Sequence, residues 1–118
     1  MAIAHAVSGE VVDLLAPGGV TTPDKTLALF KAKDLEVMRI VLPAGKRVPD
    51  HSVPGSITVQ CLGGQVELFL PHQTAVLSAG QFAYVGGGVP HGLHALKDSD
   101  LLVTIAISGN GNTSTTTG

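Results

Sequence analysis

The sequence contains no tryptophan, one tyrosine and three phenylalanines among its 118 residues. Its hydrophobic core must therefore be built mainly from Val, Leu, Ile and Ala. Cys61 is the only cysteine, which excludes an internal disulfide and a zinc site made of several cysteines. Because Cys61 lies in an apolar stretch, we expect a small buried residue and not a reactive thiol.

Charge is also scarce, with 14% charged residues and a formal net charge of −2. The seven Lys and Arg residues are scattered, so the sequence gives no electrostatic basis for binding nucleic acid or an anionic membrane. No apolar run approaches the roughly 18 residues of a membrane span, and the N-terminus lacks the features of a secretion signal. We therefore expect a cytoplasmic protein that binds neither nucleic acid nor a membrane.

The length of 118 residues suits one domain with one hydrophobic core. We expect an N-terminal arm over residues 1–9, a folded β-domain over 10–107 and a flexible polar tail over 108–118. The tail, SGNGNTSTTTG, contains no apolar side chain with which to join a core.

Short apolar stretches separated by Gly, Pro and Asp predict β-strands along the rest of the chain. No long stretch has a period of 3.6 residues, although 26–33 is also compatible with a turn or two of helix. The stretches 57–62 and 65–70 flank Gly63-Gly64, which predicts a hairpin. Many short strands are typical of an antiparallel sandwich or barrel, so the predicted fold class is all-β. The predicted strands are residues 26–30, 35–42, 57–62, 65–70, 74–77, 81–85, 91–96 and 101–107.

Two segments share a local pattern, GKRVPDH at 45–51 and GGGVPH at 86–91. Each contains glycine, then Val-Pro, and then a histidine at the edge of a predicted strand. His51 and His91 are 40 residues apart in the sequence. Only a fold that brings separate strands together can place them in one site.

Around these segments the sequence resembles the cupins. The first cupin motif runs Gly, five residues, His-x-His, three or four residues, Glu, six residues, Gly, and it is matched by Gly45, His51 and Gly64. The resemblance covers about residues 40–96. It implies a small single-domain cupin, that is, an antiparallel double-stranded β-helix or jelly-roll barrel.

The second cupin motif runs Gly, five residues, Pro-x-Gly, two residues, His, three residues, Asn. Gly80, Gly88 and His91 match it at the required spacing. Gly86 replaces the proline and Ala95 replaces the asparagine, changes that affect turn and strand-end chemistry.

The departures from the first motif affect the metal ligands that the family uses. Val53 replaces the second histidine, and the glutamate falls on Ile57, or on Thr58 if the longer spacer is taken. In cupins that retain three His and one Glu, these residues hold a divalent metal such as Zn, Fe, Mn, Ni or Cu. Here only His51 and His91 remain, so water would have to complete the coordination.

Strand parity tests for replacement ligands, because alternate residues of a strand face opposite sides. Gln60 could serve only if the turn at Pro54-Gly55 shifted the register by one, and Cys61 lies closer to the far end of its strand. If Ile57 faces inward, Val59 and Cys61 do too, while His94 faces away from His91. Glu67 is expected on the outer face of its strand. The remaining histidines, at positions 5 and 72, are expected in the arm and on a solvated turn.

Three hypotheses about function follow. In the first, the barrel mouth binds a small organic molecule in an apolar pocket whose polar anchors are His51 and His91. In the second, the same histidines and bound waters hold a metal in a dioxygenase or isomerase. In the third, one histidine is a general acid or base without a metal, with Tyr84 nearby, as in some sugar-nucleotide epimerases of the resembled fold. The predicted pocket residues are His51, Val53, Ile57, Val59, Tyr84, His91 and Leu93.

A homodimer is the expected assembly, because small cupins commonly pack barrels together or exchange N-terminal strands. Phe69 and the apolar strand LLVTIAI at 101–107 are the expected interface residues.

Overall fold

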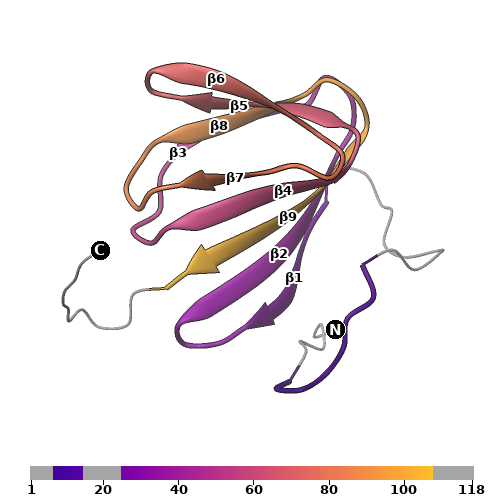
Figure 1. The fold of residues 1–118 in the computed structure, drawn as a ribbon, viewed down its shortest axis with the longest axis vertical. Coiled ribbons are helices and arrows are strands. Elements are labelled where there is room, and N and C mark those ends of the chain that lie inside the picture. Colours follow the sequence, from indigo (N-terminus) through magenta and orange to yellow (C-terminus); the bar gives the residue numbers. More distant parts are fainter. Residues whose placement is uncertain (1–6, 15–24, 108–118) are drawn as a thin grey trace.

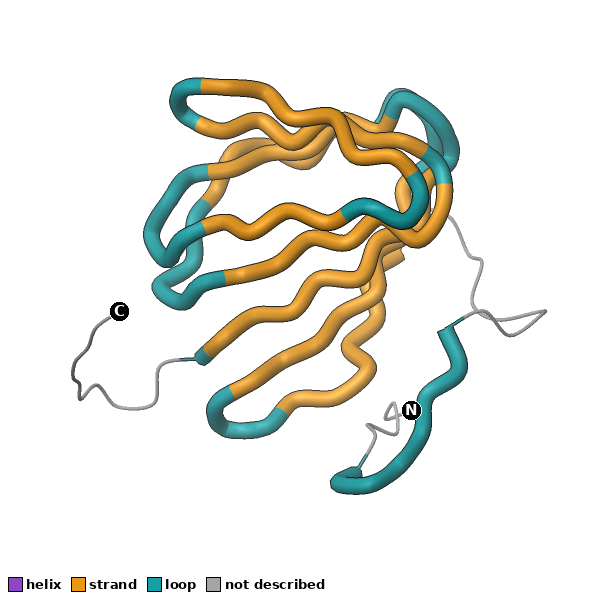
Figure 2. Tube along the Cα trace, in the orientation of Figure 1, coloured by secondary structure: helices purple, strands orange, loops and turns teal. Residues whose placement is uncertain are grey.

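The computed structural model describes residues 7–14 and 25–107, and all regular structure in these residues is β-strand (Figures 1 and 2). The expected all-β fold is therefore confirmed. The sequence left both helix and strand open for residues 26–33, and the structure has a strand over Lys25–Lys31. Among the described residues no helix is long and apolar enough to cross a bilayer. The strands are β1 (Lys25–Lys31), β2 (Leu35–Leu42), β3 (Arg47–His51), β4 (Ile57–Gly63), β5 (Gln65–Leu70), β6 (Gln73–Ser78), β7 (Phe82–Val85), β8 (His91–Ala95) and β9 (Ser99–Ala106).

The strands form two antiparallel sheets that face each other across the core, as expected for a jelly-roll barrel (Figure 1). The first sheet has the order β1-β2-β9-β4-β7, and the second has the order β3-β8-β5-β6. Consecutive strands therefore often lie in different sheets, and most of the pairing joins distant parts of the chain. This arrangement brings the two motif segments together.

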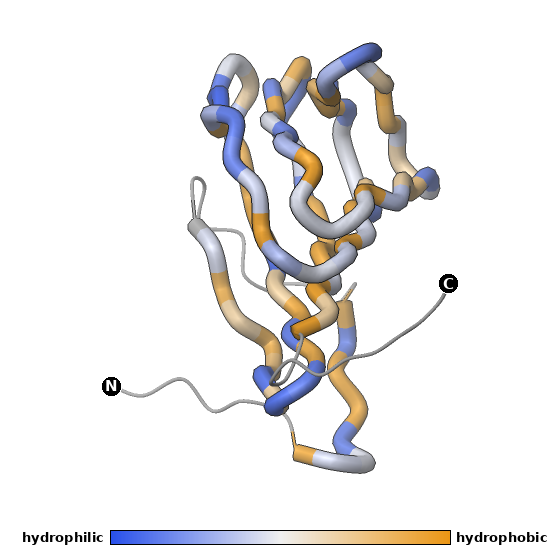
Figure 3. The backbone as a smooth tube through the Cα atoms, turned by 90° about the vertical axis from the view of Figure 1, so that its left-hand side faces the viewer, coloured by the Kyte–Doolittle hydropathy of each residue, from blue (hydrophilic) through white to orange (hydrophobic). Residues whose placement is uncertain are grey.

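The core follows the alternation of apolar residues within each strand. In β4, Ile57, Val59 and Cys61 are at most 4% exposed, whereas Thr58 and Gln60 between them are half-buried. The inward parity expected for this strand is confirmed. Figure 3 shows hydrophilic residues gathered at several of the turns that connect the apolar strands.

The predicted hairpin between residues 57–62 and 65–70 is wrong. β4 pairs with β7 and β9 in one sheet, and β5 pairs with β6 and β8 in the other. Gly64, with a φ of 86°, turns the chain from one sheet to the other. A Cβ at this position would collide with the backbone of Asp98 and Ser99, so glycine serves close packing at a corner and not a hairpin.

The predicted strands did not include β3, whose sequence RVPDH contains a proline. Pro49 is tolerated because β3 lies at the edge of its sheet and its pairing with β8 is irregular between Val48 and His51. Edge strands and bulges are the places in a sheet where a missing N–H costs least.

The predicted domain boundaries fall partly outside the described residues. Residues 1–6 of the predicted arm (1–9), residues 15–24 of the predicted barrel and the predicted tail (108–118) lie outside them, as does His5. Residues 10–14, assigned to the barrel from the sequence, continue the non-strand segment that begins at residue 7. The first strand among the described residues begins at Lys25.

Candidate functional site

Neighbouring strands bring the two motif histidines together. His51 ends β3, His91 begins β8, and the register of the two strands pairs one with the other. Their ring centroids are 4.5 Å apart and the ring planes are inclined by 55°. The fold thus places in contact two side chains that the sequence separates by 40 positions.

A backbone carbonyl fixes the orientation of each imidazole. Nδ1 of His51 lies 3.2 Å from the carbonyl oxygen of Pro49, and Nδ1 of His91 lies 3.0 Å from that of Val89. A carbonyl oxygen can only accept a hydrogen bond, so each Nδ1 must carry the proton. In the neutral rings both Nε2 atoms therefore keep a lone pair, which can accept a proton from a ligand or bind a metal.

The two rings differ in exposure. His51 is exposed, whereas His91 is only 4% exposed. No buried side-chain nitrogen or oxygen among the described residues lacks a hydrogen-bond partner, and Nε2 of His91 makes no hydrogen bond to these residues. This atom must therefore reach the solvent, which places a lone pair at the surface of an otherwise buried ring.

The positions of the other cupin ligands carry apolar side chains. Ile57 is 4% exposed and belongs to the core, and Val53 packs against that core. Within 7–14 and 25–107, no group of three or more His, Cys, Asp or Glu residues could hold a metal ion. The residues present therefore do not fit the four-ligand metal site of the family.

The predicted pocket residues are not all in one place. Ile57, Val59 and Leu93 are at most 5% exposed and form part of the packed core. The two cavities described below do not include them.

Tyr84 was predicted to line the same pocket, and the structure corrects this prediction. It pairs with Thr58, and its side chain is 66% exposed, whereas its neighbour Val85 pairs with Ile57 and is 2% exposed. Because adjacent residues of a strand face opposite sides, Tyr84 lies on the outer face of the barrel.

The glycine-rich loop before His91 is packed tightly against the turn after His51. The amide of Gly88 donates a hydrogen bond to the carbonyl of Val53, at 2.8 Å. A Cβ on Gly87 would collide with the backbone of Pro54. The two motif segments thus hold each other in place, and the loop that positions His91 has little freedom to move.

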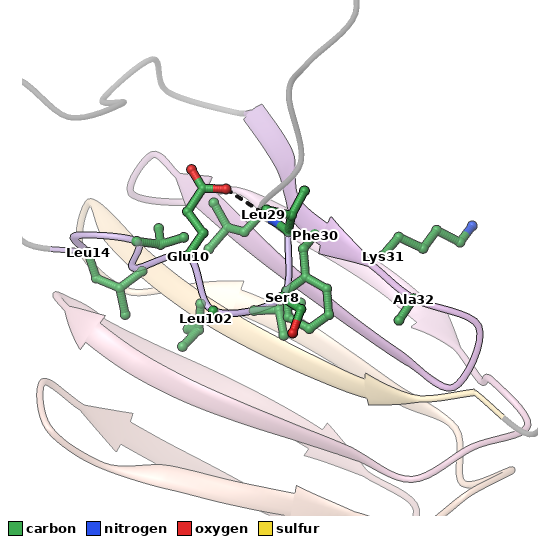
Figure 4. A pocket seen from close by; sticks show the side chains of 12 residues that line it. Ser8, Glu10, Leu14, Leu29, Phe30, Lys31, Ala32 and Leu102 are labelled. Carbon is green, nitrogen blue, oxygen red and sulfur yellow. Dashed lines mark hydrogen bonds between the residues drawn. The ribbon is translucent and has the colours of Figure 1, made fainter.

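One cavity lies beneath the segment 7–14, against the outer face of β1, β2 and β9 (Figure 4). Its volume is about 570 Å³. Glu10 accepts a hydrogen bond from the amide of Val7, at 3.0 Å, and so is occupied within its own segment. The apolar lining includes Val12, Leu14, Phe30, Val37 and Leu102.

A second cavity, the loop cavity, lies between the turn from β5 to β6 and the loop 86–90. Its volume is about 550 Å³, and its polar lining residues are His72, Gln73 and Tyr84. The sequence analysis treated His72 as a solvated turn residue and placed Tyr84 elsewhere. No sequence signal joined the two, because their proximity depends on how the sheets meet.

The outer face of the second sheet carries a separate hydrogen bond between a histidine and a carboxylate. Nδ1 of His94 lies 2.8 Å from a carboxylate oxygen of Glu67, and the guanidinium of Arg47 lies 5.8 Å from the centre of the Phe69 ring. The expectations that His94 faces away from His91 and that Glu67 faces outward are confirmed.

Two titratable groups lie apart from the histidine pair and support the fold. Arg39 donates two hydrogen bonds to Asp100 from Nε and Nη2, at 2.9 and 2.5 Å, and these raise the pKa of the guanidinium. Burial raises the pKa of the Cys61 thiol. The expectation of a buried cysteine is confirmed, since Cys61 is 0% exposed.

A family model described as "Cupin domain" matches residues 38–107. The fold is similar to that of a conserved protein of unknown function from Streptococcus pyogenes, with a TM-score of 0.74, 24% identity, and 92% of this chain and 98% of that chain covered. It is also similar to a cupin superfamily protein from Desulfitobacterium hafniense, with a TM-score of 0.69, 15% identity and coverage of 71% and 77%. For KdgF from Halomonas sp. the TM-score is 0.65, the identity 19% and the coverage 70% and 79%. Among curated proteins, none matches the chain in sequence.

Proposed function

This chain belongs to the cupin family, and from that premise we propose that its barrel mouth binds a small organic molecule through His51 and His91. The observation that carries the proposal is the contact between the two rings, each with Nδ1 directed to a carbonyl. Two lone pairs at the edge of an apolar wall form a site with few polar anchors. Small-molecule sites generally combine apolar walls with a small number of fixed polar groups.

The direction of the hydrogen bonds sets the chemistry of the ligand. Because both Nε2 atoms accept, the neutral site favours hydroxyl, amide or ammonium groups that donate. Val53, which is partly buried at the edge of the core, favours an apolar body beside these groups, since it cannot satisfy a buried polar atom.

The test combines metal analysis with ligand titration on protein purified without a histidine tag. The wild-type protein is titrated with a panel of small alcohols, amides and carboxylates, and the side-chain resonances of His51 and His91 are followed by NMR. We expect metal-free protein whose two imidazoles shift together on binding, and His51→Ala and His91→Ala should each weaken that binding at least about tenfold, or 1.4 kcal/mol. Stoichiometric metal that both substitutions remove would overturn the proposal.

A second candidate is a metal-dependent dioxygenase or isomerase in which His51 and His91 hold a divalent ion with water. One observation favours it, namely that both Nε2 lone pairs are free of protein partners among the described residues. The apolar side chains at positions 53 and 57 count against it. The metal analysis above separates the two candidates.

A third candidate, metal-free acid–base catalysis with a tyrosine beside the histidine, loses its basis. Tyr84 is the only tyrosine of the chain, and it lies on the outer face, away from the inner wall that holds Ile57.

We further propose that the protein is cytoplasmic and that it forms a homodimer. Light scattering on purified protein tests the homodimer by measuring its molar mass. β9 lies between β2 and β4 in its sheet, so both of its edges are already paired. A partner could contact the outward side chains of β9, such as Leu102 and Thr104. Phe69 points outward from the other sheet, on the opposite side of the barrel, and would belong to a second contact. Leu102→Asp should shift the equilibrium toward the monomer; an unchanged dimer would place the interface elsewhere.

A further inference from the structure

We propose that the loop cavity, between the β5–β6 turn and the loop 86–90, is a second binding site that takes a neutral hydroxylated ring such as a monosaccharide. Its volume of about 550 Å³ falls within the range of roughly 300–1,000 Å³ typical of small-molecule sites. This site is separate from the histidine pair, and it does not depend on the function proposed above.

Three polar side chains converge on the cavity from different elements. His72 and Gln73 come from the turn and the start of β6, and Tyr84 comes from β7. None of the three makes a hydrogen bond to another described residue. A phenol, an imidazole and an amide can each donate and accept, which matches the hydroxyl groups of a sugar.

The residue types of the lining disfavour strongly charged ligands. None of the residues that line the loop cavity is Asp, Glu, Lys or Arg. A carboxylate or phosphate placed here would lose hydration without gaining an opposite charge. The lining therefore favours a neutral ligand.

The remaining lining is apolar and can contact one face of a ring. Leu70, Val85 and Val89 contribute aliphatic groups, and the ring of Tyr84 is 66% exposed beside them. An aromatic ring that carries a hydroxyl combines an apolar surface with a polar tip. A pyranose has the same combination, with C–H groups on its faces and hydroxyls at its rim.

The loop side of the cavity is already ordered. The amide of Gly88 is bonded to Val53, and the amide of Val89 donates to the carbonyl of Gly86 at 3.2 Å. A ligand therefore meets a wall that requires little ordering on binding, which lowers the entropic cost of association.

Tyrosine emission provides a direct measurement. Because the chain contains one tyrosine and no tryptophan, its intrinsic fluorescence comes from Tyr84 alone. The protein is titrated with methyl glucopyranoside and, for comparison, with the corresponding methyl glucuronoside, which adds a carboxylate to the same ring. We expect a saturable change in emission with the neutral glycoside and at least tenfold weaker binding of the charged one.

Matched variants locate the site, with amide shifts of Gly86 to Gly88 measured by NMR in place of emission. Phe82 is the control, because it is 65% exposed on the same strand but does not line the cavity. Tyr84→Ala should weaken binding at least tenfold and His72→Ala about three- to tenfold, whereas Phe82→Ala and His51→Ala should leave it unchanged. All four residues are exposed, so the variants should fold, and the NMR spectrum verifies this.

Three results would overturn the proposal. The first is no saturable response to the neutral glycoside at tens of millimolar. The second is equal binding of the two glycosides. The third is a loss of binding in His51→Ala that matches the loss in Tyr84→Ala, which would place the sugar at the histidine pair instead and leave the proposed function of the barrel mouth intact.

Discussion

The two faces of β8 hold histidines in opposite surroundings. His91 faces the barrel interior, is 4% exposed and contacts a second imidazole. His94, three residues later, lies on the outer face and is paired with the carboxylate of Glu67. The same type of side chain is thus an acceptor site at the barrel mouth on one face of the strand and the partner of a carboxylate on the other face. The difference shows that the face of the sheet, and not the residue type, sets the chemistry here.

The sharpest way to break this comparison is to place a carboxylate on each face of β4. Ile57→Glu should lower the free energy of unfolding by about 3 kcal/mol or more, since it buries an unpaired polar group in the core. Thr58→Glu, one residue along on the outer face, should change it by less than about 1 kcal/mol. Urea denaturation measures both.

Ile57→Glu can also be combined with Val53→His to test the inner wall as a metal site. The double variant restores the family's ligand types beside His51 and His91, so added Ni²⁺ or Zn²⁺ should raise its melting temperature by several degrees more than that of the wild type. Equal metal-induced shifts in the two proteins would show that the inner wall is not arranged to converge on one ion.

A cavity in the core should have the next largest effect. Leu68 is 0% exposed and pairs with Leu93 of β8, so Leu68→Ala should cost about 3 kcal/mol. Val76 pairs with Glu67 on the outer side of the same sheet and is 50% exposed, so Val76→Ala should cost less than about 0.5 kcal/mol. Similar losses in denaturation experiments would contradict the assignment of inner and outer faces.

The rate of thiol modification also tests the difference between the inner and outer faces. Cys61 is buried, and its raised pKa keeps the thiol protonated, so iodoacetamide at pH 8 should react with it on the order of a hundredfold more slowly than with an exposed thiol. Val76→Cys supplies that exposed thiol in the same molecule. Mass spectrometry should show one fast and one slow modification, and two fast ones would mean that the barrel opens readily.

The raised pKa of Cys61 also predicts how stability responds to alkali. Because the native state disfavours the thiolate, the contribution of this group is fully present at neutral pH. It declines as the pH rises beyond the ordinary value of 9.0, where the unfolded chain ionises first. Cys61→Ala should flatten the alkaline limb of the stability curve.

The smallest effect is expected for the contact between His94 and Glu67 on the outer face. The side chains of His94 and Glu67 are 22% and 30% exposed, so Glu67→Gln should cost about 0.5 kcal/mol, and less at high salt. Denaturation at two ionic strengths provides the measurement. A loss above about 2 kcal/mol would mean that the pair supports the sheet as strongly as the core residues behind it.

The pairing of the strands was the least predictable part of the fold. The glycines at 63 and 64 were compatible with a hairpin, yet β4 and β5 lie in different sheets. Local turn chemistry describes how the chain reverses or bends, but it does not determine which distant strand will accept the next set of hydrogen bonds. Local signals also did not identify β3. Its proline is tolerated because the strand lies at the edge of a sheet, and the sequence alone does not show which strand takes an edge position.

By itself, the sequence determined the inward row of β4, the burial of Cys61 and the motif spacing that identifies His51 and His91. These depend on alternation within one strand and on local turns, which are short-range properties. Only the tertiary structure decided that the two imidazoles touch, that both Nδ1 atoms meet carbonyls, and that Tyr84 faces outward beside His72. The physical reason is that these contacts depend on the register between strands and on how the two sheets meet. Both join residues that are far apart in the sequence, and the alternation within one strand does not determine which of them become neighbours.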